Sequence, residues 1–287
     1  MRPLSPPRDE DAQAFAVDVV FETCIAMVKN PVLRAQLRAV RRDVNTEAAD
    51  YDIKAAGKQL FQKQPHDRVG SVSGDEMVKV YTLRMVPRTS TGRPIYDRIM
   101  SLPAHRRCPL CGIGTVNTLD HYLPKSHFPV YSVTPNNLVP VCKWCQGEKS
   151  EYYSTTEGGQ LLHPYFDDVD DEVWLAADVV AGVPAGFRYF AAPPVHWTPS
   201  AKSRVTAHLR ELNLVVLFSA NAGSRLSEIR ARLANLYQKE GGSDVVRAHL
   251  REELASLNAD QRNSWAAAMY RAAVASDWFC KGGFLET

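Results

Sequence analysis

The chain has 287 residues, of which 45% are hydrophobic and 23% are charged. These ordinary values exclude an intrinsically disordered chain, and the length is sufficient for one or two domains with their own cores. The formal charge of +2 creates no whole-molecule field that would attract a polyanion. This neutrality is a cancellation, because residues 1–150 carry 21 basic and 15 acidic groups, whereas residues 151–287 carry 13 and 17.

The amino-terminal residues 1–8 read MRPLSPPR and lack the apolar core that a secretion signal needs. The longest apolar stretch without a formal charge, around residues 212–224, is interrupted by polar side chains and is much shorter than a bilayer span. We therefore expect a cytoplasmic protein that does not cross a membrane.

Residues 1–92 are predicted to form a helical region. Apolar side chains recur at helical spacing between residues 9 and 64, and a capping box at Ser73 and Glu76 starts a further helix that is expected to reach Val86. One of the predicted helices also carries a stripe of three arginines, Arg34, Arg38 and Arg42. This stripe is either a solvated face or a surface that contacts phosphate.

Positive charge accumulates ahead of the first cysteine pair. The segment from Lys79 to Arg107 holds seven basic residues and one acid, Asp97. Much of the basic excess of the first half of the chain is therefore next to the cysteines.

Four of the six cysteines form two C-x2-C pairs separated by 30 residues: Cys108 with Cys111, and Cys142 with Cys145. Two residues between thiolates allow one knuckle to present both sulfurs to one ion, and two knuckles complete a closed tetrahedral set. The pattern predicts a structural Zn²⁺ with no open ligand position. Cys24 and Cys280 are isolated in apolar surroundings and are expected to pack as buried hydrophobes.

The segment between the two pairs contains a further group of polar residues. Short apolar stretches at residues 116–119 and 138–141 suit two strands, and residues 143–153 suit a helix. This order would bring Asp120, His121 and Asn137 close to the first turn of that helix. An Asp-His dipeptide alone is more often structural than catalytic.

Residues 168–287 are predicted to form a β-hairpin followed by helices. Residues 172–180 and 186–192 are rich in β-forming side chains and flank a turn at residues 182–185. Thr198 can cap a helix that starts at Pro199, and Asn258 with Gln261 resembles a second capping box. The acidic run over residues 167–172 is expected to be a solvated loop.

This part of the sequence resembles the HNH endonucleases with the ββα-metal fold, in their four-cysteine zinc form. The likeness covers residues 96–167, and the matching residues are Cys108 and Cys111, Leu119-Asp120-His121, Pro124-Lys125-Ser126, Asn137-Leu138-Val139-Pro140, Cys142 and Cys145, and Lys149-Ser150. The resemblance implies an α+β protein: a small ββα-metal core at residues 93–167 with a structural zinc knuckle, flanked by mostly helical regions.

The resemblance also implies an activity, the metal-dependent hydrolysis of phosphodiester bonds in DNA. His121 would be the general base, because an ordinary histidine pKa lies near neutrality. Asp120 would bind a catalytic Mg²⁺ or Mn²⁺, and Asn137 would fix the loop or the imidazole through its amide. The residues expected to contact nucleic acid are Lys125, Lys149, Arg106 and Arg107. Replacing His121 by Ala should abolish cleavage with little change in melting temperature.

The chain departs from the family directly after the last zinc cysteine, where the family usually carries Asn or His as a further metal ligand and this chain has Gln146. A glutamine oxygen can bind Mg²⁺, but it lies one methylene further from the backbone. Either Gln146 serves as this ligand, or His163 or Asp167 supplies it instead, or activity is weakened. These alternatives remain open from the sequence.

The segment at residues 162–167, LHPYFD, resembles anti-phage defence HNH proteins of the Septu and retron-associated kind. Such proteins are often encoded beside an ATPase, so DNA and an ATPase are the expected partners. Two other functions fit the same residues. One is a catalytically weak, zinc-stabilised module that binds nucleic acid or protein, and the other is an HNH nuclease that cleaves RNA.

Overall fold

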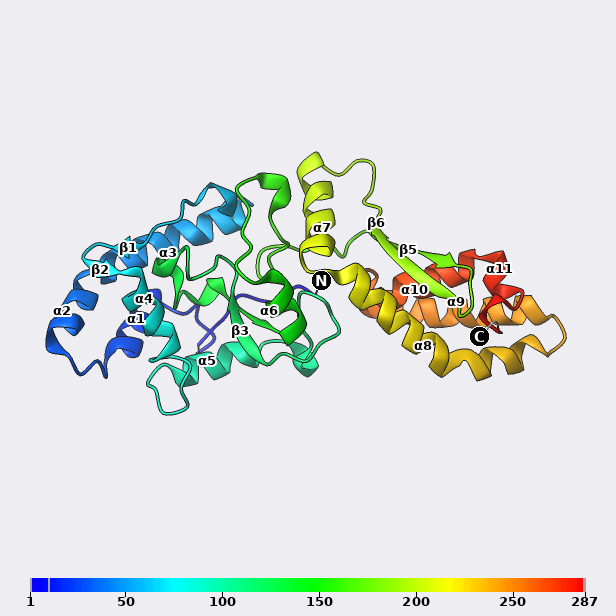
Figure 1. Ribbon diagram of the computed structural model, residues 1–287, viewed down its shortest axis with the longest axis horizontal. Helices are drawn as coiled ribbons and strands as arrows, with labels where there is room; N and C mark the ends of the chain where they lie inside the picture. Colours follow the sequence, from blue (N-terminus) through cyan, green and yellow to red (C-terminus); the bar gives the residue numbers. More distant parts are fainter. Residues whose placement is uncertain (1, 10, 286–287) are drawn as a thin grey trace. The chain divides into compact units, whose positions relative to one another are not determined.

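The computed structural model describes residues 2–9 and 11–285. The chain is a mixed α+β protein in which short antiparallel hairpins are set among helices (Figure 1). The described residues divide into two compact units, residues 2–167 and residues 168–285. No helix in the described part of the chain is long and apolar enough to cross a membrane.

The amino-terminal part of the first unit is helical, as predicted. The helices are α1 (Val17–Ile25), α2 (Pro31–Ala39), α3 (Arg41–Ala56), α4 (Gly74–Thr82) and α5 (Arg93–Met100). Asn30 caps α2 by accepting the N–H groups of Val32 and Leu33. Ser73 Oγ accepts the N–H of Glu76 at 3.4 Å, which confirms the predicted cap of α4, although this helix ends at Thr82 and does not reach Val86.

Two small hairpins belong to the same unit. Strand β1 (Arg68–Val69) pairs with β2 (Val72–Ser73) directly before α4. Strand β3 (Thr118–His121) pairs antiparallel with β4 (Leu138–Val141), with Asp120 opposite Val139 and His121 opposite Leu138. All four residues of β4 are buried.

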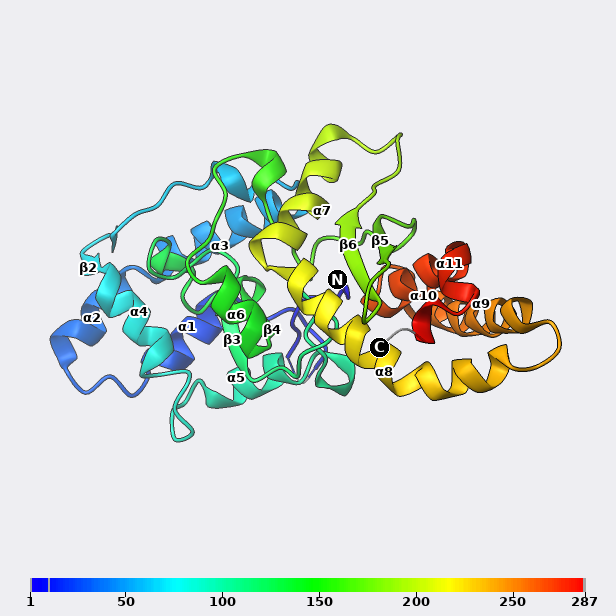
Figure 2. The same ribbon diagram turned by 45° about the vertical axis from the view of Figure 1, so that its right-hand side comes forward.

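Helix α6 (Lys143–Lys149) begins directly after β4. It lies beside the β3–β4 pair in both views of the ribbon, and α5 also packs on these strands (Figures 1 and 2). The expected order of two strands and a helix is therefore present. The first strand begins two residues later than predicted and extends to His121.

The second unit contains the predicted hairpin and five helices. Strand β5 (Leu175–Val180) pairs with β6 (Gly186–Ala191), and the helices are α7 (Pro199–Glu211), α8 (Leu214–Tyr237), α9 (Gly242–Gln261), α10 (Trp265–Ala275) and α11 (Asp277–Cys280). Helix α10 packs on β5 and helix α8 on β6. Thr198 caps α7 through the N–H of Ala201, as expected.

Two predictions are wrong, one about a helix cap and one about the acidic run. Asn258 and Gln261 lie inside α9, and the cap of the next helix is Ser264, which accepts the N–H of Ala267 at 3.1 Å. The acidic run is not simply a solvated loop, because Asp167 is buried and Asp170 accepts the N–H of Asn263 at 2.9 Å. The short-range pattern did not reveal these distant partners.

Candidate functional site

Four buried cysteines form the best-defined site of the chain: Cys108, Cys111, Cys142 and Cys145. Their sulfur atoms all lie within 4.8 Å of one another, and Cys111 Sγ is 3.7 Å from Cys142 Sγ. Zinc–sulfur bonds of about 2.3 Å in a tetrahedron place the sulfurs roughly 3.8 Å apart. The quartet therefore fits a metal ion such as Zn²⁺.

The local backbone explains how the first pair forms a knuckle. The N–H of Gly112 donates to Cys108 O at 2.8 Å, and Gly112 adopts a φ of 72°, a conformation that favours glycine. Gly114 leaves space for the second pair, since a Cβ at this position would lie 2.6 Å from Cys142 Sγ. Both glycines are therefore required by the geometry of the knuckle.

The environment of Cys111 favours the thiolate that binds metal. The N–H groups of Ile113 and Gly114 both donate to Cys111 Sγ at 3.4 Å. Backbone N–H donors are a common complement to zinc-bound sulfur because they stabilise its negative charge.

Asp120 and Lys149 form an ion pair between β3 and α6. The Asp120 side chain is 16% exposed at β3, and its Oδ2 lies 3.3 Å from Lys149 Nζ on α6. Lys149 is only 3% exposed and also donates to His121 O at 2.7 Å. Burial lowers the pKa of Lys149, and the charge of Asp120 opposes this shift. This buried setting differs from the exposed phosphate contact that the sequence predicted for Lys149.

His121 is the last residue of β3, and its side chain has different contacts from that of Asp120. Its side chain is 2% exposed, and Nε2 lies 2.9 Å from Ser132 O, so Nε2–H donates and the lone pair of the neutral ring is on Nδ1. The Tyr81 ring contacts the imidazole edge to face at a centroid distance of 4.5 Å. Tyr81 in turn donates to Leu119 O at 2.9 Å. These contacts fix the orientation of the imidazole.

Burial also changes the acidity of His121. It lowers the pKa of His121 to about 3, with smaller contributions from the charges of Lys125 and Lys149, while the hydrogen bond to Ser132 O acts in the opposite direction. The sequence-based expectation of a pKa near neutrality is therefore wrong for the free protein. Because the ring is buried, replacing it by Ala should also destabilise the unit, contrary to the expectation from the sequence.

Asn137 is fully buried and joins the two ends of the loop between β3 and β4. Its Oδ1 accepts the N–H of Leu123 at 2.8 Å, and its Nδ2 donates to Leu123 O at 3.0 Å and to Tyr131 O at 3.3 Å. The predicted contact with the loop backbone is present. Ser132, which orients His121, directly follows Tyr131, so Asn137 supports the histidine through the loop.

Gln146 is exposed on α6, three residues before Lys149. Side chains at this spacing are neighbours on a helix surface, so Gln146 is a neighbour of the lysine that pairs with Asp120. Among the other predicted nucleic-acid contacts, Lys125 is half-buried over the Tyr81 ring at 5.9 Å, and Arg106 and Arg107 are exposed.

His163 and Asp167 belong to a separate buried cluster. The His163 Nε2 pairs with the Tyr51 hydroxyl at 3.0 Å, and its Nδ1 accepts the N–H of Tyr165 at 3.2 Å. Asp167 forms an ion pair with Lys58 at 3.1 Å and accepts the N–H of His163 at 2.7 Å. A cation at either residue would displace these partners. The structure therefore provides no free ligand at either position.

Within residues 2–9 and 11–285, the cysteine quartet is the one group of three or more His, Cys, Asp or Glu side chains close enough to hold a metal ion. A second cation at Asp120 would thus need ligands of another kind, such as an amide oxygen, water or substrate.

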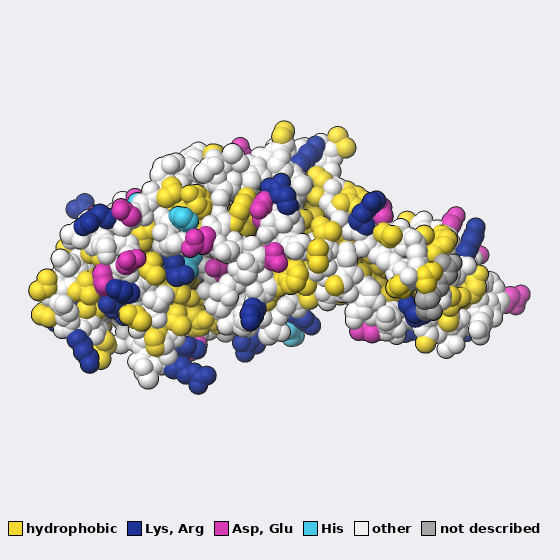
Figure 3. Space-filling model, in the orientation of Figure 1, with side chains coloured by type: hydrophobic (Ala, Val, Ile, Leu, Met, Phe, Trp, Pro, Cys, Tyr) yellow, Lys and Arg dark blue, Asp and Glu magenta, His cyan; other side chains and the backbone are white. Residues whose placement is uncertain are grey.

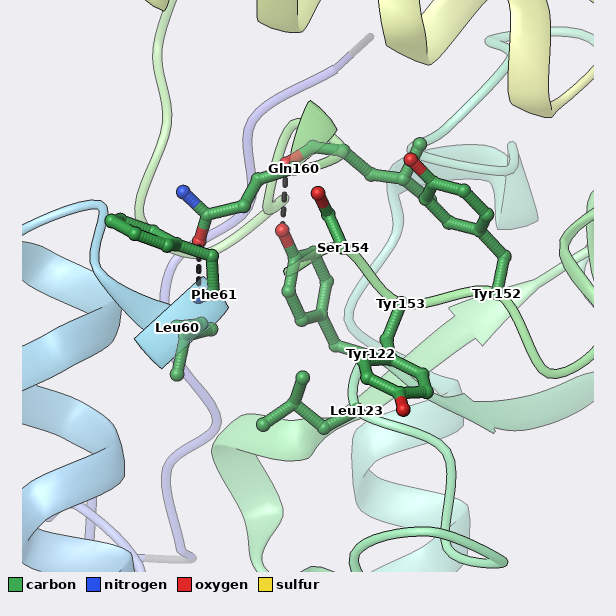
Figure 4. A pocket seen from close by; sticks show the side chains of 9 residues that line it. Leu60, Phe61, Tyr122, Leu123, Tyr152, Tyr153, Ser154 and Gln160 are labelled. Atoms are coloured by element: carbon green, nitrogen blue, oxygen red, sulfur yellow. Dashed lines mark hydrogen bonds between the residues drawn. The ribbon is translucent and has the colours of Figure 1, made fainter. Parts of the chain in front are cut away.

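A small cavity is lined in part by Tyr122 and Leu123, which directly follow His121 (Figure 4). Leu60, Phe61 and several aromatic residues line it, and the Tyr122 hydroxyl donates to Leu161 O at 2.7 Å across it. Its volume of about 10 Å³ is enough for one water molecule at most. We assign it to packing.

Sequence reasoning missed the groups that support His121. Tyr81 comes from α4, about forty residues before the histidine, and Ser132 contributes only a backbone carbonyl. Neither contact has a local sequence signal. The pairing of Lys149 with Asp120 also has no local sequence signal.

Together these observations define an α+β protein in which four buried cysteines, close enough to hold a metal ion, lie beside a short hairpin and a helix. Protein ea31 of Escherichia phage lambda is 31% identical to it over 229 residues, which cover 75% of this chain and 76% of the phage protein. The chain belongs to the family of this phage protein. No family model matches the chain, and no solved structure matches it.

Proposed function

We propose that the chain is a metal-dependent HNH endonuclease that hydrolyses phosphodiester bonds of DNA. In this proposal β3, β4 and α6 are the ββα-metal core, and the cysteine quartet holds a structural Zn²⁺. The observation that carries the proposal is the neutral, oriented imidazole of His121 next to the partly exposed carboxylate of Asp120, both at one end of β3.

His121 would act as the general base through Nδ1, since Nε2–H is held by Ser132 O. A pKa of about 3 keeps the ring unprotonated at neutral pH but makes it a weak base. Lys125 and Lys149 contribute to this low value, so a bound phosphate that offsets their charge would raise the pKa of His121. Substrate binding would thereby strengthen the base when it is needed.

Asp120 and Gln146 are the side chains that would hold a catalytic Mg²⁺ or Mn²⁺. Both offer oxygen, which these hard ions prefer, and Mg²⁺ commonly takes one or two protein ligands together with water and substrate phosphate. Such an ion supplies positive charge to the phosphorus centre and the leaving oxygen. Lys149 would keep the Asp120 carboxylate in place and act as a positioning residue.

The test is nicking of supercoiled plasmid by the full chain with Mg²⁺, with Mn²⁺ and with EDTA. We expect nicking with either ion and none with EDTA, and we expect Gln146→Asn to retain or raise the rate, since Asn has the same donor atom. Labelled DNA and RNA strands of one sequence show which nucleic acid is cut. Equal activity in EDTA would contradict the proposal.

A second candidate is a zinc-stabilised DNA-binding module without catalysis. Two observations favour it: His121 is 2% exposed, and Lys149 already neutralises Asp120. This candidate predicts DNA binding without nicking under any metal condition. An ATPase partner and a role in anti-phage defence remain predictions.

A further inference from the structure

A polar cleft of about 830 Å³ lies between α5, the turn that follows it and the residue before β3. Its lining includes Arg88, Arg93, His105, Arg106 and Asn117. Basic side chains gather along the edge of the first unit that carries α5 and the loop ahead of it (Figure 3). The cleft therefore combines an open volume with positive charge.

The charge of this cleft is only partly neutralised. Arg93 pairs with Asp97 at 2.9 Å and lies over the Tyr96 ring at 4.8 Å, so it is fixed in place. Arg88 is exposed and forms no ion pair among the residues that the structure describes, and the same is true of Arg106. Two guanidinium groups are thus available for an anion.

The turn that carries Arg106 has an unusual backbone. His105 and Arg106 both have positive φ values, 52° and 55°, which are uncommon for residues other than glycine. Arg106 Nη2 donates to Val116 O at 3.2 Å, which ties the turn to the residues just before β3. The guanidinium group is therefore held at the side of the cleft that adjoins the hairpin.

The cleft is close to the proposed catalytic residues. Asn117 extends the hairpin by donating its N–H to Val141 O at 3.0 Å, and it precedes Asp120 by three residues. At roughly 3.3 Å per residue of strand, the two are about 10 Å apart.

We propose that this cleft binds the phosphodiester backbone of the strand that is cut, with Arg88 and Arg106 each contacting a phosphate. The inference rests on the proposed nuclease function. Phosphates of one DNA strand are spaced about 3.4 Å along the helix axis, so a separation of about 10 Å places the cleft at most about three nucleotides from the scissile phosphate. A polyanionic backbone matches an open, arginine-lined cleft better than a compact apolar ligand does.

The experiment measures binding of a fluorescein-labelled DNA duplex by anisotropy, between 50 and 200 mM NaCl, without added divalent metal. The full chain with His121→Gln serves as the parent, so that cleavage cannot interfere. The test variant adds Arg88→Ala and Arg106→Ala. The control adds Arg232→Ala and Lys239→Ala, which remove the same charge from exposed positions of the second unit.

Each phosphate contact contributes a slope of about 0.9 in the logarithm of affinity against the logarithm of salt, or a factor of about 8 at 0.1 M. We expect the cleft variant to lose about 60-fold in affinity and to lower the slope by about 1.8, and the control to change affinity less than threefold. Equal losses in the two variants, or no loss in the cleft variant, would overturn the inference.

The result also separates this inference from the proposed function. If the unmodified chain nicks plasmid but the cleft variant binds like its parent, the cleft assignment fails and the nuclease proposal stands. If the unmodified chain neither nicks DNA nor binds it, both fail together. If DNA is bound but not nicked and the cleft variant loses affinity, the cleft assignment stands and the nuclease proposal fails.

Discussion

Replacing Asn137 by Ala should destabilise the first unit by about 3 kcal/mol. The side chain is fully buried and makes three hydrogen bonds to the loop between β3 and β4. Alanine would leave the Leu123 N–H, the Leu123 carbonyl and the Tyr131 carbonyl without this partner in a buried setting. A buried polar group that loses its partner costs about 1–3 kcal/mol, and the loop can relax to recover part of this loss.

The assay is urea unfolding at neutral pH, with hydrogen exchange of the segment 122–132 as a local readout. Asn136→Ala is the matched control, because this neighbouring asparagine is only partly buried and makes one side-chain hydrogen bond, to Asp52 at 2.8 Å. We expect the control to lose about 1 kcal/mol. Equal losses in the two variants, or an unchanged exchange rate in the segment, would refute the role of Asn137 as the support of the loop.

Three further predictions concern the knuckle and the buried histidine. Cys145→Ser should lower bound zinc well below one equivalent by atomic absorption, whereas Cys24→Ser, at a buried cysteine outside the quartet, should leave it unchanged. Gly114→Ala should weaken zinc retention against a chelator, because its Cβ would lie 2.5 Å from Cys142 Cβ; retention equal to the wild type would show that the knuckle can shift. Stability should fall with acid through His121, whose folded pKa of about 3 lies below its ordinary 6.5, so the neutral ring's contribution is present above pH 6.5 and is lost as pH falls toward 3. Between pH 7.5 and 5 this amounts to about 2 kcal/mol relative to His121→Gln, and an identical acid response of the two proteins would contradict the low pKa.

The sequence predicted those features that depend on residues close together in the chain. Each C-x2-C pair is a local pattern. The two pairs meet because the antiparallel strands β3 and β4 between them bring the second pair back beside the first. The hairpin in the second unit and the caps at Ser73 and Thr198 were also readable from short patterns.

The remaining features depend on contacts between distant segments. His163 resembles a free ligand in the sequence, but Tyr51 of α3, 112 residues earlier, occupies its Nε2. Lys149 looks like a surface lysine, yet it is buried against Asp120 and the backbone of His121. The low pKa of His121 likewise follows from burial by several elements, which no local pattern reports.

The most direct test of the central claim compares plasmid nicking by the wild type and by His121→Gln with Mg²⁺. Glutamine has an N–H donor that can replace Nε2–H toward Ser132 O, so zinc content and unfolding at neutral pH serve as checks on structure. His196→Ala, at an exposed histidine of the second unit, is the control. We predict that His121→Gln loses at least about 100-fold in nicking rate, the usual contribution of a general base, and that His196→Ala retains the full rate. Undiminished nicking by a folded, zinc-bound His121→Gln protein would contradict the assignment of His121 as the base.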